Sequence, residues 1–307
     1  MTETVAEAGT ITGATAGTSP GAGTEGRLRQ TWRSLRGSPS AMTGIVLVAL
    51  HLAVALAAPL LAPGSPVADN ALDALQAPSA AHLAGTDQYG RDILSRTLYG
   101  GRLALSVSLS ATVLAVGLGA AVGCLVAYRR GWLDDVVMRV VDAVLSVPPV
   151  LALLVIVTVL GTDPVVIVLA VTVVYGPGVV RVVRAAALDV VPRDYVTAAR
   201  ARGEGTFSVL LRDIGPNVLD VVLVEFAMRA SWVVLLISSL SFLGFGANPP
   251  TPDWGLMVAE NRSMLTVAPW TSIAPIIALS TLVIGLNMAA DGLAKALGVD
   301  RAHGGAA

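Results

Sequence analysis

The stretch that decides the fold is AMTGIVLVALHLAVALAAPLLA, Ala41–Ala62, which contains no Asp, Glu, Lys or Arg. A helix of this length spans about 30 Å, which matches the hydrocarbon core of a bilayer. A cleaved signal peptide is the alternative, but its apolar region has only about 7 to 15 residues. We therefore expect Ala41–Ala62 to be an uncleaved membrane span. The arginines that precede it are Arg27, Arg29, Arg33 and Arg36.

The remaining chain also has the composition of a bilayer protein. Hydrophobic residues make up 54% and charged residues 13% of the 307 residues, whereas soluble domains carry about 25% charged residues. The mean hydropathy is +0.74. Five further apolar runs predict an all-α membrane protein with six transmembrane helices. They lie at Leu103–Tyr128, Val140–Gly161, Val165–Val183, Val218–Gly246 and Ser272–Ala290.

Two of these spans contain residues that disrupt helices. Pro148 and Pro149 predict a kink in the third span. The fourth span contains Tyr175-Gly176-Pro177-Gly178, where we expect the helix to bend or break. Before the first span, residues 1–37 are expected to form a disordered tail, because their Thr-, Gly- and Ala-rich start lacks apolar periodicity.

Positive residues are distributed unevenly about the spans. If the N-terminus is inside, fifteen of the 20 Lys and Arg residues lie in cytoplasmic segments, and Arg91, Arg96, Arg102 and Arg262 lie outside. Such residues near span ends are retained in the cytoplasm. We therefore predict that both termini are cytoplasmic. The net charge of −1 predicts no nucleic-acid partner.

The longest predicted cytoplasmic segment is Val183–Leu219, which is Ala-rich and contains several arginines. With Pro192 upstream and Asp194 as N-cap, it predicts a short helix on the membrane face that ends near Gly203. One interpretation is a helix held by anionic lipid headgroups through its arginines. The other is a docking element for a partner protein.

Opposite charges alternate at short spacing in GTDQYGRDILSR, residues 85–96. Asp87, Arg91, Asp92 and Arg96 lie beside two glycines, which predicts a tight turn held by ion pairs at the outer membrane face. Such a cluster can have a purely structural role, in which it holds the loop in place. Trp254 and Trp270 are expected to mark the outer interface.

Ionisable residues also occur within or near the predicted spans. Glu225 and Arg229 stand four apart in the order that favours a helical ion pair, which lowers the cost of burying either charge. They are candidates for a pore-lining role. Asp142 and Asp291 lie near the predicted cytoplasmic ends, where solvent or a partner can satisfy them.

Motifs for catalysis are absent from the sequence. There is no G-x-x-x-x-G-K-[ST] phosphate-binding loop, so the chain is not expected to hydrolyse ATP alone. There is also no H-E-x-x-H and no G-x-S-x-G, which disfavours an intramembrane hydrolase. We therefore predict no catalytic residue and no metal ligand. A secondary transporter is the remaining alternative from topology, and inverted repeats would distinguish it.

Three segments resemble the permeases of ABC importers. The cytoplasmic segment is similar to their Glu-Ala-Ala-x-x-x-Gly signature at Ala198, Ala199 and Gly203, and Pro216 follows at the expected spacing. Thr197, Asp213 and Gly215 depart from the pattern. GTDQYGRDILSR resembles the GTDxxGRDxxSR stretch of the C-type subunits of the dipeptide, oligopeptide and nickel branch. The residues concerned are Gly85, Thr86, Asp87, Gly90, Arg91, Asp92, Ser95 and Arg96. Ser241–Gly246 and the Asp253-Trp254-Gly255 that follows are similar to the end of the fifth span in these subunits.

This resemblance implies a type I ABC importer permease in a bacterial inner membrane. It implies a tail over residues 1–37, a first helix and external loop over 38–102, a five-helix core over 103–300 with a coupling loop at about 192–217, and a cytoplasmic tail over 301–307. The loop, with Asp194, Tyr195, Thr197, Ala198, Ala199, Gly203 and Pro216, would contact one of two ATPases, which bind ATP and Mg. A second homologous permease and an external binding protein are the other implied partners. Peptide is the expected cargo, with nickel or glutathione as alternatives.

Overall fold

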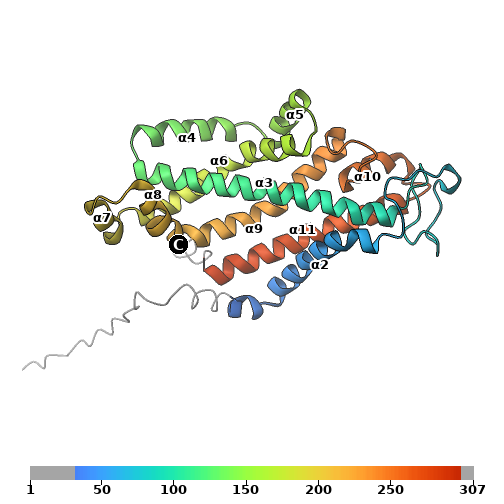
Figure 1. The fold of residues 1–307 in the computed structure, drawn as a ribbon, viewed down its shortest axis with the longest axis horizontal. Helices are drawn as coiled ribbons and strands as arrows, with labels where there is room; N and C mark the ends of the chain where they lie inside the picture. Colours follow the sequence, from blue (N-terminus) through green and yellow to red (C-terminus); the bar gives the residue numbers. More distant parts are fainter. Residues whose placement is uncertain (1–31, 299–307) are drawn as a thin grey trace, which may run out of the picture.

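The computed structural model describes residues 32–298, which form helices joined by loops, with one isolated β-bridge between Thr86 and Asp92. The long helices run side by side along the length of the molecule (Figure 1). In chain order the helices are α2 Pro39–Leu61, η1 Ala71–Asp73, α3 Ile93–Arg129, α4 Trp132–Leu145, α5 Pro149–Leu160, α6 Pro164–Val190, α7 Asp194–Ala201, α8 Thr206–Val209, η2 Leu210–Ile214, α9 Gly215–Leu240, η3 Ser241–Phe245, α10 Trp254–Asn261, η4 Arg262–Met264 and α11 Trp270–Leu297.

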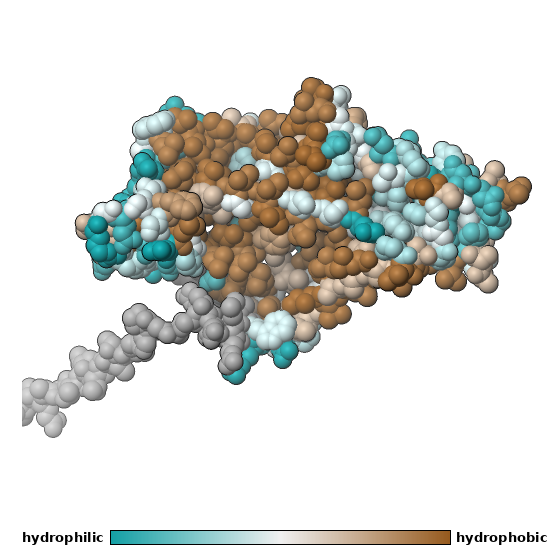
Figure 2. All heavy atoms as spheres, viewed as in Figure 1, coloured by the Kyte–Doolittle hydropathy of each residue, from teal (hydrophilic) through white to brown (hydrophobic). Residues whose placement is uncertain are grey.

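The molecule has two polar ends and an apolar middle. Five helical segments are long and apolar enough to cross a membrane, or up to six if α4 and α5 together form one span. Figure 2 shows a brown apolar surface between teal regions at the two ends. The loop that contains α7 and α8 lies at one end, and α10 lies with the 62–92 loop at the other (Figure 1). Below, these are the α7 end and the α10 end.

Glycines allow close contact between the long helices. A Cβ on Gly44 of α2 would lie 2.4 Å from the backbone nitrogen of Ala289 of α11, and one on Gly119 of α3 would lie 2.9 Å from the carbonyl oxygen of Gly176 of α6. Between membrane helices, which have no hydrophobic effect to drive them together, such backbone approach supplies the packing energy. These glycines therefore let α2 pack closely on α11 and α3 pack closely on α6.

The third predicted span is wrong as a single helix. α4 and α5 meet at an angle of 88°. Pro148 has extended ψ of 129°, as expected for a residue before proline, and Pro149 starts α5. The double proline therefore ends one helix and begins another, where a kink was expected.

Of the bend or break predicted in the fourth span, the break is wrong. α6 runs unbroken from Pro164 to Val190 with Pro177 inside it. The other predicted spans match α2, α3, α9 with η3, and α11, although α3 begins ten residues earlier than Leu103, because Asp92 caps it through a bond from the Ser95 N–H.

The predicted tails lie mostly outside the described residues. Residues 32–36 are helical and Leu35 is buried, which departs from the disorder expected over 1–37. Residues 1–31 and the predicted tail over 301–307 are not described.

Candidate functional site

A group of charged side chains is buried at the α10 end, and we call Asp87, Arg91, Arg96 and Glu260 the outer cluster. The Arg91 Nε lies 2.7 Å from the Asp87 Oδ2, and the Arg96 Nε lies 3.6 Å from the same atom. The Glu260 Oε2 accepts from both arginines, at 3.1 Å and 3.2 Å. The arginine side chains are only 4% and 1% exposed. Two positive and two negative groups thus neutralise one another out of water.

The rest of the GTDQYGRDILSR stretch folds as a turn around this cluster. Gly85 and Gly90 have φ of 76° and 73°, and a Cβ on Gly90 would lie 1.8 Å from the carbonyl oxygen of Asn70. The Thr86 hydroxyl donates to the Asp73 carbonyl. Asp92 caps α3 and contacts the His82 Nδ1 at 3.1 Å. The turn predicted from the sequence is present, and ion pairs hold it.

Glu260 was not predicted as a member of this cluster. It stands 164 residues after Arg96 and belongs to α10, which packs against α3 only in the folded chain. No periodicity or motif in the sequence relates the two segments. The tertiary contact alone brings in the second carboxylate.

α10 is fastened to the first turns of α3 by Trp254. The indole Nε1 donates to the Thr97 carbonyl at 2.8 Å, and the ring covers Gly100 and Gly101. Trp254 is buried and Trp270 is half-buried beside Gly85; their position at the outer membrane interface stays a prediction. At the start of α10, burial raises the pKa of the Asp253 carboxyl, which accepts from the Leu256 N–H.

The candidate docking loop forms the short helix α7 at the opposite end. α7 begins one residue earlier than expected, because Arg193 rather than Asp194 occupies the cap position, and it ends before Gly203, whose φ is 78°. Val196 and Ala199 are buried in a cluster with residues of α3, α6 and α9. The remaining predicted residues, Asp194, Tyr195, Thr197, Ala198, Gly203 and Pro216, are exposed. The helix therefore offers its polar and small side chains to the outside and uses Ala199 to hold itself in place.

An arginine in α7 contacts the end of α3. The Arg200 guanidinium stacks over the Tyr128 ring, 4.1 Å from its centroid, and Nη2 donates to the Tyr128 carbonyl at 3.0 Å. Nearby, the Arg129 Nη2 donates to the Thr206 hydroxyl at 3.3 Å. Both ends of α3 are thus attached to loop elements, one to α10 and the other to α7 and α8.

The predicted intramembrane ion pair is present in α9. The Arg229 Nε donates to the Glu225 Oε2 at 2.7 Å, and its Nη1 lies 3.5 Å from the Tyr175 carbonyl of α6. A Cβ on Gly178 would lie 2.9 Å from the Arg229 Nη2. The guanidinium therefore occupies the space that Gly178 leaves free, which gives the YGPG sequence of α6 a packing role.

The two aspartates predicted near span ends have different surroundings. Asp142 of α4 pairs with Arg181 of α6, and Asp134 makes a second, two-bond pair with Arg184 at 2.6 Å and 2.5 Å. These pairs bind α4 along α6. Asp291 is exposed on α11. The predicted intramembrane residues therefore do not form one site.

One side of α9 is left uncovered by the chain, and we call Met228, Trp232, Leu235 and Ser239 the α9 open face. Trp232 is 61% exposed. At 3.6 residues per turn, Glu225 lies on the same side. On the neighbouring α11, Asn287 is exposed and accepts from the Ser231 hydroxyl at 2.8 Å. This surface carries more polar groups than a lipid-facing surface requires.

Within residues 32–298, no group of three or more His, Cys, Asp or Glu side chains is arranged to hold a metal ion.

Comparison with known proteins identifies the family. The profile described as "Binding-protein-dependent transport system inner membrane component" matches residues 115–299. The chain belongs to this family. A second profile, "N-terminal TM domain of oligopeptide transport permease C", matches residues 26–78. The expected resemblance to ABC importer permeases is therefore confirmed, and the chain is a multi-pass inner-membrane permease.

Similar proteins carry the names of peptide and glutathione permeases. The dipeptide transport system permease protein DppC of Alkalihalophilus pseudofirmus is 33% identical over 269 residues, covering 88% of each chain. The glutathione transport system permease protein GsiD of Pectobacterium atrosepticum is 34% identical over 272 residues, covering 88% of this chain and 90% of its own.

A solved structure of the MetNI methionine ABC transporter, in an inward-facing conformation, matches with a TM-score of 0.53 at 19% identity. The match covers 67% of this chain and 96% of that chain. At this identity it shows the fold, which is the expected ABC importer permease fold.

Proposed function

We propose that this permease forms half of the translocation path of an ATP-driven importer of di- or oligopeptides. Its relatives named for dipeptide transport cover nearly the same length as this chain. A second, homologous permease supplies the other half, and an external binding protein delivers the cargo. The lipid bilayer surrounds both subunits.

The observation that carries this proposal is the α9 open face with its neighbours. Trp232, the Glu225–Arg229 pair and the exposed Asn287 border one surface at membrane depth. Polar and ionisable side chains facing hydrocarbon are costly, so such a surface belongs against protein or a water-filled cavity. A path shared with a second permease satisfies both conditions.

The chain contributes no catalysis in this proposal. Its sequence has no phosphate-binding loop, so ATP and Mg are bound by two cytoplasmic ATPases. The exposed side of α7, with Tyr195, Thr197 and Ala198, is the surface that docks on one of them. Movement of the docked α7 then shifts the helices between inward-facing and outward-facing arrangements.

Orientation follows from the positive residues. The α7 end carries most of the arginines and is placed in the cytoplasm. The α10 end, with the outer cluster, faces the binding protein. The division into a first helix with external loop over 38–102 and a core over 103–300 stays a prediction, and its boundary falls within α3, Ile93–Arg129.

Glutathione is the second candidate cargo, since relatives named for glutathione transport are similar at 34–35% identity. Glutathione is itself a small peptide. Nickel, the runner-up from the sequence, has no supporting feature among the described residues.

Uptake by the complete transporter in proteoliposomes tests this function. The external binding protein is loaded with a labelled dipeptide, a longer peptide, glutathione or Ni²⁺, and ATP is placed on the ATPase side. Peptide accumulation that requires ATP supports the proposal. Accumulation of Ni²⁺ alone, or accumulation without ATP, contradicts it.

A further inference from the structure

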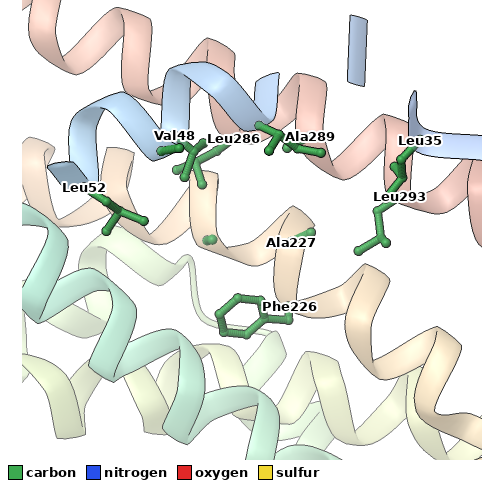
Figure 3. A pocket seen from close by; sticks show the side chains of 11 residues that line it. Leu35, Val48, Leu52, Phe226, Ala227, Leu286, Ala289 and Leu293 are labelled. Carbon is green, nitrogen blue, oxygen red and sulfur yellow. The ribbon is translucent and has the colours of Figure 1, made fainter. Parts of the chain in front are cut away.

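An apolar groove of about 390 Å³ runs between α2, α9 and α11. Figure 3 shows Leu35 and Leu293 at one end of it and Leu52 at the other, with Phe226 across from α2. It follows α2 from Ile45 to Leu52 for about 10 Å. Alanines on all three helices line it together with larger apolar side chains. The groove therefore has the elongated, apolar shape of a hydrocarbon chain.

Three exposed cations lie close in sequence to Leu35 and Leu293, the leucines at one end of the groove. Arg33, Arg36 and Lys295 lie within two residues of these two leucines and are exposed. Within residues 32–298 none of the three pairs with an acidic side chain; the Arg36 guanidinium instead lies 4.8 Å from the centroid of the exposed Trp32 ring. A tryptophan beside basic residues at a span end is typical of the headgroup region. An anionic headgroup is complementary to this charge.

The groove does not open toward the surface assigned to the translocation path. Along α9, Phe226, Ala227 and Ala230 line the groove. At 3.6 residues per turn they project about half a turn away from the α9 open face. A second permease that meets the open face therefore leaves the groove to the bilayer.

We propose that this groove is a binding site for an anionic phospholipid, with one acyl chain between α2, α9 and α11 and the phosphate against Arg33, Arg36 and Lys295. The bound lipid holds α2 to α9, since α2 packs chiefly on α11 and α3. This site is independent of the cargo and of the proposed translocation path.

Native mass spectrometry of the purified transporter tests the site. The complex is mixed with equal amounts of phosphatidylglycerol and phosphatidylcholine that carry the same acyl chains, and the lipids retained are counted. Wild-type protein is expected to retain phosphatidylglycerol preferentially. Removing a basic residue near an anionic headgroup lowers affinity about fivefold. R33Q/R36Q should therefore lose most of the bound phosphatidylglycerol, whereas R139Q, an exposed arginine of α4, should lose none.

A second pair of variants tests the acyl chain. Ala49→Phe fills the groove from α2, whereas Thr43→Phe places the same ring on the opposite, exposed side of α2. A49F should lose bound lipid and T43F should retain it. Equal retention of both lipids by wild type, or equal lipid in A49F and T43F, overturns the proposal. Loss of the second permease from A49F with its lipid unchanged also overturns it, because a protein helix then occupies the groove.

Discussion

Glu260 is the residue whose removal the structure makes most costly at the α10 end. It accepts from two arginines that are 4% and 1% exposed. Removing one partner of a buried pair costs about 3–5 kcal/mol, because a charge is left uncompensated. Asp87 still lies 2.7 Å and 3.6 Å from the same arginines, so Glu260→Ala is expected at the lower limit of that range. For domains of about 150–250 residues a loss of about 3 kcal/mol lowers the melting temperature by about 6–12 °C, and for this chain of 307 residues we expect a shift near the lower limit.

The assay is thermal unfolding of the purified transporter, followed by fluorescence. Asp69→Ala is the matched control, because Asp69 lies 3.8 Å from Arg91 but is 68% exposed, where an ion pair contributes about 0–1 kcal/mol. Glu260→Gln keeps an acceptor oxygen and should fall between the two. A melting temperature for E260A within the error of D69A would refute the assignment of Glu260 as a buried counter-ion.

Four further substitutions, in two matched pairs, test other contacts. Gly176→Ala and Gly178→Ala each gain about 1 kcal/mol of helix propensity, but only a Cβ at Gly178 comes close to the Arg229 guanidinium, at 2.9 Å. G176A should therefore raise the melting temperature, and G178A should not. Equal gains in the two variants would contradict the packing of Arg229 against Gly178. Arg200→Ala should lower transport per ATP hydrolysed about fivefold, because its stacking on α3 is lost. Arg202→Ala should leave this ratio unchanged, because Arg202 pairs with Glu204 within the same loop. Equal ratios in the two variants would refute the coupling role of Arg200.

The membrane spans could be predicted because hydrocarbon offers no hydrogen-bond partner, so every backbone group that faces it must be satisfied within the protein. An uncharged run such as Ala41–Ala62 has few alternatives to a helix. Proline was harder to interpret, because its effect depends on neighbours. Pro148 and Pro149 end a helix, whereas Pro177 lies within an unbroken one. The double proline acted through its local backbone restriction, whereas α6 stays continuous where it packs against Arg229.

The candidate sites were predictable only where their partners are close in sequence. Glu225 and Arg229 meet because they stand one helical turn apart. Glu260 lies on an element far from Arg96 in sequence, and its contribution became visible only in the fold. The sequence also did not reveal that Ala199 is buried, because the signature motif gives the spacing of residues but not which side of the helix faces the core.

The central claim is that α7 couples this permease to ATPases, and co-purification of the tagged chain from its native membrane tests it most directly. The account predicts recovery of a second permease, two ATPases and a solute-binding protein, with ATP hydrolysis lost in Ala198→Arg, which alters the exposed side of α7. Recovery of the chain without any ATPase in several mild detergents, with transport intact in A198R, would contradict it and favour a secondary transporter.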